Sequence, residues 1–403
     1  MKWNPSRNQE QWIFEGKIWT DACPLVAGED RGRLEVHPLS KIQEEISVGK
    51  KLGFGIIGLG EIAFKSTGKF FQETEHARLV AGVDPVDEMA RSYQETYGIP
   101  CSTQLDDVLS HPDVDAVIVS TPHDLHVPIG IKAAEAGKHV IVEKPIATTL
   151  EDADALISAC RRNGVLCSAK EAGVRYQAPT IKAKELIDDG AIGEIMAVQI
   201  AGMSNKPVSY WTGGYSQRVQ TTWRMSKSQS GGGVLLMNYI YDIHRMLYVT
   251  GLEVKRVFSE FDTFRTDAEV EDFITVAIRF NNGALGTITS ASCVPGAKVS
   301  GVRGTESSGN RIFGSSGQLV FHRNELLVFT EKSIDGLTRN EWTTVSFKSE
   351  RLQPYANYVD RFALAAMNGR PAEVPGEEGR RTLEVLVGAY KSGESGQPVQ
   401  FPM

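Results

Sequence analysis

A tyrosine and a histidine lie three residues apart near the middle of the chain. Residues 231–244 read GGGVLLMNYIYDIH, so Tyr241 and His244 follow a run of three glycines and an apolar stretch. Residues at this spacing share one face of a helix. A phenol and an imidazole that face the same way could form a proton-transfer pair. The alternative is the polar edge of a core helix, where both side chains only find hydrogen bonds.

A second group of residues has the spacing of a phosphate-binding turn. The sequence GLGEIA places Gly58, Gly60 and Ala63 directly after an apolar strand pattern and at the start of a helical one. The first glycine permits a tight turn, the second lets the backbone approach a pyrophosphate, and a small third residue allows close helix–strand packing. This context predicts a dinucleotide site with its phosphate at the helix N-terminus. A glycine turn without a ligand is the alternative.

An acidic residue follows where a dinucleotide site needs one. Asp84 stands in AGVDPVDE, at the end of the next apolar strand pattern and 24 residues after Gly60. A carboxylate there can bond the ribose hydroxyls and repels a 2′-phosphate, and no arginine directly follows it. NAD is therefore predicted over NADP. The alternative is that Asp84 is only a turn residue before Pro85.

The elements that must position these residues fall into two groups. Over residues 51–172, Val- and Ile-rich runs alternate with helical patterns, as in a parallel sheet with helices on both faces. Over residues 173–403, most patterns are strand-like and separated by Gly, Asn or Asp turns, which indicates a mostly antiparallel sheet. We predict an α/β chain: a dinucleotide-binding Rossmann domain, then an α+β domain for substrate binding and oligomerisation, with the final helix packed back on the Rossmann domain.

Composition excludes several classes of protein. The 403 residues carry a net charge of −7 and no basic stretch, which argues against nucleic acid or an anionic membrane surface as the main partner. No apolar run approaches the length of a membrane span, and the N-terminus lacks the apolar core of a secretory signal. Five cysteines without C-x-x-C spacing favour free thiols in a reducing compartment. We therefore expect a cytoplasmic protein without structural zinc.

Residues 1–50 differ from the rest and are expected to form an N-terminal extension. They contain Trp3, Trp12 and Trp19, half of the six tryptophans, with no clear period. Because exposed aromatic side chains promote association, we expect the extension to pack on the folded body or on a neighbouring subunit. A partly ordered tail is the alternative.

The stretch VSTPHDLHVPIGIKAAEAGKHVIVEKPIA resembles the most recognisable motif of the Gfo/Idh/MocA family of sugar and inositol dehydrogenases. The match includes Thr121–Pro122, Leu125–His126, Gly137–His139 and Glu143–Pro145. The glycine turn, the later glycine run and the closing GEEGRRTLEVLVGAYKSGESGQPV follow in family order, so the resemblance covers about residues 51–403. It implies a Rossmann domain followed by an α/β domain with a large open sheet, an active site between them, and a homo-oligomer, as a dimer, a tetramer or a larger assembly.

The resemblance also implies NAD-dependent oxidation of a secondary hydroxyl of a sugar, glycoside or cyclitol. Lys144 would lie beside the hydroxyl and the nicotinamide. The family's usual aspartate, histidine and aspartate fall on Met237, Tyr241 and His244. This departure is similar to the glucose–fructose oxidoreductase and dihydrodiol dehydrogenase branches, whose tyrosine is the acid–base group. We expect Lys144 to lower the pKa of Tyr241 and His244 to relay the proton, with the choice between Tyr241 and His244 as primary base left open.

Two rival functions stay open. One is a dehydrogenase of the same fold that acts on a dihydrodiol or aromatic-derived substrate. The other is a non-catalytic NAD-binding sensor, which the loss of the usual histidine and aspartates would allow and which the retained Lys144 argues against.

The predicted site is therefore a nucleotide and small-molecule site without a metal, since His123 and His126 have no partner at metal-ligand spacing. The catalytic residues predicted are Lys144, Tyr241 and His244; the cofactor-binding residues are Gly58, Gly60, Glu61, Ile62, Ala63, Asp84, Ser120, Thr121, Pro122, His123, His126, Glu143 and Lys144; and the substrate-binding residues are Arg175, Tyr176, Tyr215, Trp223, Arg224 and Asn238.

Overall fold

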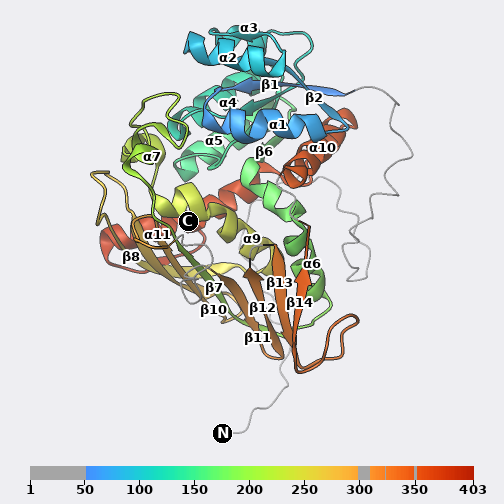
Figure 1. Cartoon of the computed structure of the whole chain (residues 1–403), viewed down its shortest axis with the longest axis vertical. Helices are drawn as coiled ribbons and strands as arrows, with labels where there is room; N and C mark the ends of the chain where they lie inside the picture. Colours follow the sequence, from blue (N-terminus) through green and yellow to red (C-terminus); the bar gives the residue numbers. More distant parts are fainter. Residues whose placement is uncertain (1–50, 298–308, 323, 349–351) are drawn as a thin grey trace, which may run out of the picture. The chain divides into compact units, whose positions relative to one another are not determined.

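Within the described residues, six parallel strands form the first sheet, which carries the glycine turn (Figure 1). The computed structural model describes residues 51–297, 309–322, 324–348 and 352–403. The strand order is β3-β2-β1-β4-β5-β6, so the winding reverses between β1 and β4. The strands are β1 (Leu52–Ile57), β2 (Ala77–Val83), β3 (Cys101–Ser102), β4 (Ala116–Val119), β5 (His139–Val142) and β6 (Cys167–Ala169).

Both faces of the first sheet are covered, which explains its continuous apolar strands. Along β4, Val117 and Val119 belong to one buried cluster with residues of α3, α4 and α5. Ile118 between them belongs to another, with residues of α1, α2 and α10. Alternate side chains thus enter opposite layers, and the predicted parallel sheet is confirmed. The helices are α1 (Gly68–Phe70), α2 (Asp87–Tyr97), α3 (Leu105–Leu109), α4 (His126–Glu135), α5 (Leu150–Arg162) and α10 (Gln353–Met367).

A second, mixed sheet follows, with nine strands in the described part of the chain. Its order is β14-β13-β12-β11-β7-β10-β9-β8-β15, and apart from the parallel β7–β10 pair its neighbours are antiparallel. The predicted mostly antiparallel sheet is therefore confirmed. The strands are β7 (Ile195–Met203), β8 (Val254–Asp262), β9 (Phe273–Phe280), β10 (Leu285–Ala291), β11 (Asn310–Gly314), β12 (Gly317–His322), β13 (Glu325–Thr330), β14 (Trp342–Ser346) and β15 (Val399–Gln400).

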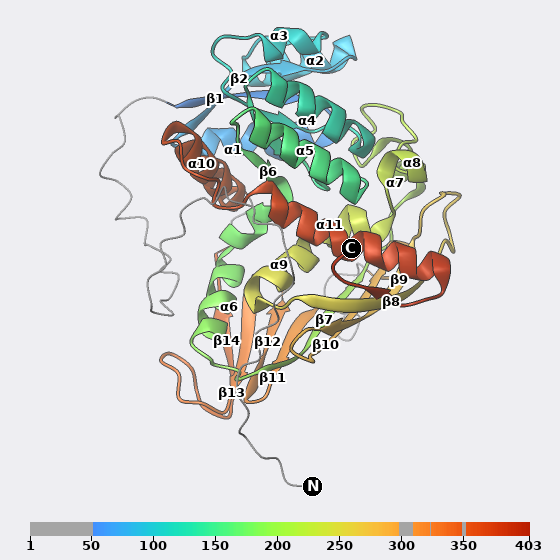
Figure 2. The ribbon, with the colours of Figure 1, turned by 180° about the vertical axis from the view of Figure 1, so that it is seen from behind.

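One face of the second sheet packs on helices and the other is open. Along β9, Ile274, Val276 and Ile278 are buried, while Thr275 and Ala277 between them are exposed. Figure 2 shows α11 (Gly376–Ser395) passing from α5 and β6 of the first sheet to β8 of the second, and its contacts with all three agree. The final long helix therefore contacts elements of both sheets. Two further helices, α6 (Ala178–Asp188) and α9 (Ile240–Thr250), pack together beside the second sheet.

Short helical segments between the strands and the longer helices carry part of the candidate site. They are the π-helix η3 (Ala63–Thr67), the 3₁₀-helices η5 (His123–Leu125) and η6 (Lys170–Tyr176), the short helices α7 (Val208–Gly213) and α8 (Lys227–Ser230), and the π-helix η7 (Leu235–Tyr239) that runs into α9. The predicted domain boundary after residue 172 falls inside η6 and stays a prediction. The predicted packing of Trp3, Trp12 and Trp19 lies outside the described residues.

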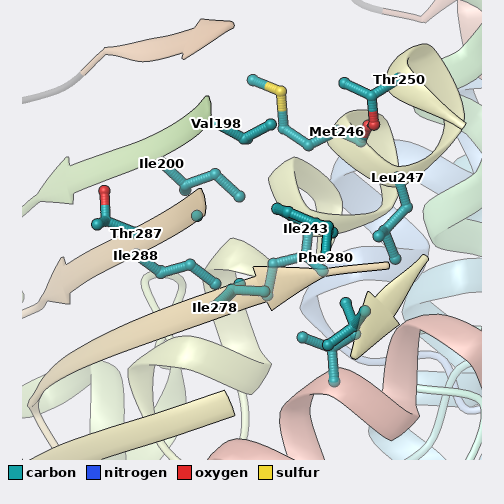
Figure 3. Close-up of a pocket in the computed structure, with 13 residues that line it drawn as sticks. Val198, Ile200, Ile243, Met246, Leu247, Thr250, Ile278, Phe280, Thr287 and Ile288 are labelled. Carbon is teal, nitrogen blue, oxygen red and sulfur yellow. The ribbon is translucent and has the colours of Figure 1, made fainter. Parts of the chain in front are cut away.

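An apolar pocket lies between α9 and the covered face of the second sheet (Figure 3). Ile243, Met246 and Leu247 of α9 face Ile200, Ile278 and Ile288 across it. None of the predicted site residues lines this pocket, so it is separate from the candidate active site. Among the described helices, none is long and apolar enough to cross a membrane.

Candidate active site

The turn after β1 has the geometry that a dinucleotide needs. Gly58 has a φ of +91°, and a Cβ on it would lie 2.8 Å from the backbone carbonyl of Ser120. A Cβ on Gly60 would meet no atom within 4 Å, so open space lies beside the turn. The hydroxyl of Ser120, just after β4, is buried and has no hydrogen-bond partner among the described residues. An open cradle and an unpartnered hydroxyl at the β1–β4 switch point fit a bound NAD.

Asp84 holds the glycine turn in place. Its Oδ2 accepts a hydrogen bond from the Leu59 amide at 2.8 Å, and its Oδ1 accepts one from the Val86 amide at 2.9 Å. A carboxylate has about four acceptor positions, so two remain for ribose hydroxyls. The turn role and the ribose role of Asp84 are therefore compatible.

The two residues between Gly60 and Ala63 behave differently from each other. Ile62 is 43% exposed next to the open turn, as a residue that faces a ligand would be. Glu61 instead forms an ion pair with Lys65 and accepts a hydrogen bond from the Tyr215 amide at 2.9 Å. The carboxylate of Glu61 thus ties the segment around α7 to the glycine turn, and its predicted contact with the cofactor stays a prediction.

The two histidines after β4 hold neighbouring loops together. His126 is fully buried, with Nδ1 2.8 Å from the Pro145 carbonyl and Nε2 3.0 Å from the Thr121 carbonyl. His123 is also buried, with Nδ1 2.7 Å from the Ser230 carbonyl. His126 thus joins the Thr121–Pro122 turn to the turn after β5. Both ring nitrogens of His126 are therefore used within the protein, and the predicted cofactor role of the two histidines stays a prediction.

Lys144 follows β5 and reaches the helix that carries Tyr241. Its Nζ donates a hydrogen bond to the Met237 carbonyl at 2.5 Å and lies 5.8 Å from the centre of the Tyr241 ring. Loss of hydration is the main cause that lowers the pKa of Lys144 to about 8; Arg224 also lowers this pKa, whereas Glu143 opposes the change. An amine in this range can accept or donate a proton near neutral pH. The predicted proximity of Lys144 and Tyr241 is confirmed.

Tyr241 keeps its proton in this environment. Burial raises the pKa of Tyr241 well above its usual value, and the nearby Tyr355 and Glu143 act in the same direction. Its hydroxyl makes no hydrogen bond with any residue that the structure describes, and is therefore available to a ligand. The expectation that Lys144 lowers the pKa of Tyr241 is wrong, because desolvation of the phenolate outweighs the ammonium.

His244 is buried, and both of its ring nitrogens are bonded to other side chains. Its Nε2 accepts a hydrogen bond from Nε of Arg175 at 2.9 Å, and since arginine only donates, the remaining proton is on Nδ1, which donates to Oγ1 of Thr382 at 2.9 Å. Burial and Arg175 hold the pKa of His244 well below its usual value. Both ring nitrogens are used, so the prediction that His244 relays a proton from Tyr241 is wrong.

Arg175 and Tyr176 are also used within the protein. The guanidinium of Arg175 donates to Glu378 of α11 at 2.6 Å and lies over the ring of Tyr248. Tyr176 packs against the cluster that holds α10 on the first sheet, with its ring 6.1 Å from that of Tyr358. The predicted substrate role of these two residues needs correction: they fasten η6 to α9, α10 and α11.

The glycine run has a packing role that fixes the helix behind it. A Cβ on Gly232 would lie 2.4 Å from the Tyr390 hydroxyl, and one on Gly233 would lie 2.0 Å from the Glu271 carbonyl. The buried Glu271 carboxylate accepts hydrogen bonds from the Gly233 and Leu235 amides at 2.7 and 2.9 Å. Sequence reasoning missed Glu271, which caps the helix that presents Asn238 and Tyr241. Its only sequence signal is its place in an acidic pair with Asp272 directly before β9.

The other predicted substrate residues have different surroundings. The ring of Trp223 lies 4.6 Å from that of His123, and the Arg224 guanidinium lies 4.5 Å from the Trp223 ring. Oδ1 of Asn238 is buried without a hydrogen-bond partner among the described residues, as a group awaiting a ligand would be. Tyr215 is 51% exposed, and its hydroxyl accepts a hydrogen bond from Nζ of Lys206 at 3.2 Å.

Charged residues that sequence reasoning missed lie beneath Lys144. Lys170, after β6, forms a buried ion pair with Glu143 and donates to Oγ1 of Thr67 at 3.0 Å. The next residue, Glu171, is fully buried and unpaired. The sequence signal that could have identified them is their place after a strand, because that strand could pair with the strand before Glu143. No group of three or more His, Cys, Asp or Glu side chains in the described part of the chain could hold a metal ion.

Comparisons with known proteins agree with this geometry. Residues 52–171 match the NAD-binding Rossmann fold model of the GFO_IDH_MocA oxidoreductase family, and residues 180–320 match the GFO/IDH/MocA C-terminal domain model. Over 207 residues the chain is 34% identical to 2,7-anhydro-N-acetylneuraminate hydratase of Mediterraneibacter gnavus, covering 50% of each chain. Over 365 residues it is 28% identical to scyllo-inositol 2-dehydrogenase (NAD(+)) of Bacillus subtilis, covering 86% of this chain and 95% of that one. The alignments span about half the length of the first curated relatives.

Solved structures resemble the whole described fold. Aldose-aldose oxidoreductase of Caulobacter crescentus, in complex with glycerol, has a TM-score of 0.73 at 29% identity, covering 87% of this chain and all of that one. Levoglucosan dehydrogenase in complex with NADH and levoglucosan has a TM-score of 0.75 at 22% identity, covering 88% and 100%, which shows the shared fold alone.

Proposed function

We propose that this chain, which belongs to the Gfo/Idh/MocA family of oxidoreductases, oxidises a secondary hydroxyl of a sugar, glycoside or cyclitol with NAD as the hydride acceptor. The observation that carries the proposal is Lys144, an amine with a pKa of about 8 that lies over the ring of Tyr241. Relatives named for levoglucosan, scyllo-inositol and 1,5-anhydro-D-fructose support the substrate class.

Lys144 and Tyr241 divide the proton chemistry between them. NAD, when bound, supplies the acceptor for the hydride that leaves the carbinol carbon. Nζ of Lys144, in its neutral form, takes the hydroxyl proton, so the alcohol C–H and O–H bonds are replaced by a carbonyl. Tyr241 keeps its own proton and donates a hydrogen bond to the same oxygen, which stabilises developing negative charge. The Met237 carbonyl holds Lys144 in position through the hydrogen bond at 2.5 Å.

The first sheet supplies the groups that would hold the cofactor. Gly58 permits the tight turn, and Gly60 leaves room for the pyrophosphate. Asp84 has acceptor positions for the ribose, and Ser120 has a hydroxyl without a partner among the described residues at the switch point. The carboxylate of Asp84 at the ribose position favours NAD over NADP, because it would repel a 2′-phosphate.

A second candidate reaction leaves no reduced cofactor free in solution. Two observations favour a cofactor that stays bound between turnovers. One is the resemblance to aldose-aldose oxidoreductase over the full length of that protein. The other is the hydrogen bond from the Tyr215 amide to Glu61, which joins the segment after α7 to the glycine turn. Hydride taken from one sugar would then return to a second one. Such an enzyme would form product without a net change in nicotinamide absorbance.

We place a homo-oligomer contact on the open face of the second sheet. Phe258, Leu285 and Trp342 are exposed on its strands by 37%, 49% and 50%. Exposed apolar side chains on a flat sheet favour association with a second copy. Together with a small-molecule substrate, this is the partner that we propose.

A substrate panel tests the proposed function. Purified protein is incubated with NAD and sugars, glycosides or cyclitols, and both nicotinamide absorbance and sugar products are followed, with the Lys144→Ala variant as the control. We expect reduced nicotinamide with at least one secondary alcohol. Product without absorbance change would favour the second candidate, and activity restricted to dihydrodiols would favour that rival class. NAD binding without any conversion would favour a sensor.

A further inference from the structure

Glu171 is a buried carboxyl group without a partner. Its side chain is fully buried, and neither Oε1 nor Oε2 has a hydrogen-bond partner among the described residues. Nearly all buried polar groups in folded proteins are hydrogen-bonded, because an unpartnered one costs stability. A residue that destabilises its own fold in this way is a candidate for a functional role.

Strand register places Glu171 beside Lys144. β5 and β6 are parallel neighbours, and their last paired residues are Val142 and Ala169. The next positions along both strands bring Glu143 beside Lys170, and their buried ion pair agrees with this alignment. The positions after these are Lys144 and Glu171. Glu171 and Lys144 therefore both lie two positions past the paired ends of neighbouring strands, close enough that Glu171 raises the pKa of Lys144.

The surrounding elements close the space around Glu171. From α11, a Cβ on Gly379 would lie 3.2 Å from its Oε1, so a glycine makes room for the carboxyl. The titratable and charged groups that face it come from the β5 turn, η6, α9, α10 and α11. They are Glu143, Lys144, Lys170, Arg175, Tyr241, Tyr355, Tyr358 and Glu378.

Two of the three nearby cations are already neutralised. Lys170 pairs with Glu143, and Arg175 pairs with Glu378. Lys144 forms no ion pair with a described residue and instead donates to the Met237 carbonyl. Among these three cations, Lys144 is thus the one that no carboxylate of the described residues neutralises. The charge of Glu171 therefore acts mainly on Lys144.

We propose that Glu171 is a positioning residue whose negative charge stabilises the protonated form of Lys144 and so sets the pH at which Lys144 takes the substrate proton. This inference rests on the proposed dehydrogenase function. Burial raises the pKa of Glu171 to about 7, while the pKa of Lys144 is lowered to about 8, so the two groups titrate in neighbouring ranges. A carboxylate beside an ammonium raises the pKa of the amine, and its removal lowers that pKa further.

The test measures the protonation of Lys144 without any substrate. Trace labelling with acetic anhydride over a pH series, read by mass spectrometry, gives the midpoint at which Lys144 becomes reactive. We compare the parent with Glu171→Gln, Glu171→Met, Glu171→Asp and, as a control on α11, Glu377→Gln, whose carboxyl pairs with Arg161 at the surface. The midpoint should fall by about one pH unit in the Gln and Met variants, and stay near the parent value in the Asp and control variants.

Stability and activity complete the test. Because the carboxyl is unpartnered, the Gln and Met variants should melt no lower than the parent at pH 8. A midpoint that is unchanged or raised in both variants would overturn the inference, as would loss of folding in both. In the pH profile of kcat/KM, the rise that accompanies deprotonation of Lys144 should move to lower pH together with the labelling midpoint. If the labelling midpoint shifts but the protein converts no alcohol, the result counts against the proposed function alone. If the enzyme is active and the rise of kcat/KM with pH does not move in the variants, the result overturns only the role of Glu171.

Discussion

At the scale of single residues, the structure separates groups that meet a ligand from groups that hold the protein together. Tyr241 has a free hydroxyl near Lys144, whereas His244 spends both nitrogens on Arg175 and Thr382. The two residues share a helix, yet they serve different purposes. Their spacing of three residues is therefore a weak indication of joint chemistry.

Tyr241→Phe should reduce turnover by roughly 10–10³-fold, because one hydrogen bond to the reacting oxygen is lost. NAD affinity and melting temperature should stay close to those of the parent, since the hydroxyl has no partner among the described residues. Steady-state kinetics and cofactor titration measure these effects. Full turnover in the variant would remove Tyr241 from the reaction.

His244→Asn should act on stability first. It leaves Arg175 or Thr382 without a buried partner, which costs about 1–3 kcal/mol. Because burial already holds the pKa of His244 well below its usual value, the imidazole stays neutral over the working range. The pH–rate profile should therefore keep its shape. Disappearance of a limb near neutral pH in the His244→Asn variant would restore His244 to the proton path.

The predictable part of the site is the part encoded by local sequence. The glycine turn, Asp84 and Lys144 each follow a strand directly, so their place at one sheet edge could be read from the chain order. The partners of His244 could not be predicted, because Thr382 lies 138 residues away on α11. Arg175 was assigned to substrate for the same reason: its partner Glu378 lies 203 residues away.

At the scale of elements, two glycines illustrate different uses of a missing side chain. A Cβ on Gly233 would overlap the Glu271 carbonyl, while one on Gly60 would enter open space. Gly233 lets the π-helix before α9 approach β9, and Gly60 leaves the cradle beside β1 open. Both belong to motifs that the sequence displays, but only the structure shows which one serves packing.

Gly60→Ala and Gly233→Ala should therefore fail in different ways. Gly60→Ala should fold with a melting temperature near that of the parent and bind NAD more weakly, because its methyl group occupies the pyrophosphate space. Gly233→Ala should lose about 3 kcal/mol or more of unfolding free energy, as overlap with backbone in a core does. Thermal melts and NAD titration separate the two effects. Equal melting temperatures for both variants would contradict this assignment.

At the scale of the whole molecule, the C-terminal helices join the two sheets. α10 packs on η6 and on β2, and α11 contacts α5, β6, β8 and α9. Order along the chain made the two sheets predictable, since apolar runs and helices alternate in the first half. The return of α10 and α11 onto them could be anticipated only from family resemblance, because amphipathic helices can cover either sheet.

The open face of the second sheet should mediate self-association. Leu285→Asp places a charge on this face and should shift the protein to a smaller species in light scattering coupled to size-exclusion chromatography. The matched control is Val208→Asp on α7, where the side chain is 75% exposed away from the sheet strands. Dissociation caused by the control and not by Leu285→Asp would place the interface elsewhere.

The most direct measurement of the central claim is the pH dependence of turnover in Lys144→Ala against the parent, with a substrate found in the panel. In the parent, kcat/KM should rise with pH through the range near 8, the pKa of Lys144, as the amine loses its proton. Lys144→Ala should lose roughly 10²–10⁴-fold in turnover and lack this limb, while it binds NAD and melts like the parent. Full turnover with an unchanged pH profile in Lys144→Ala would contradict the account.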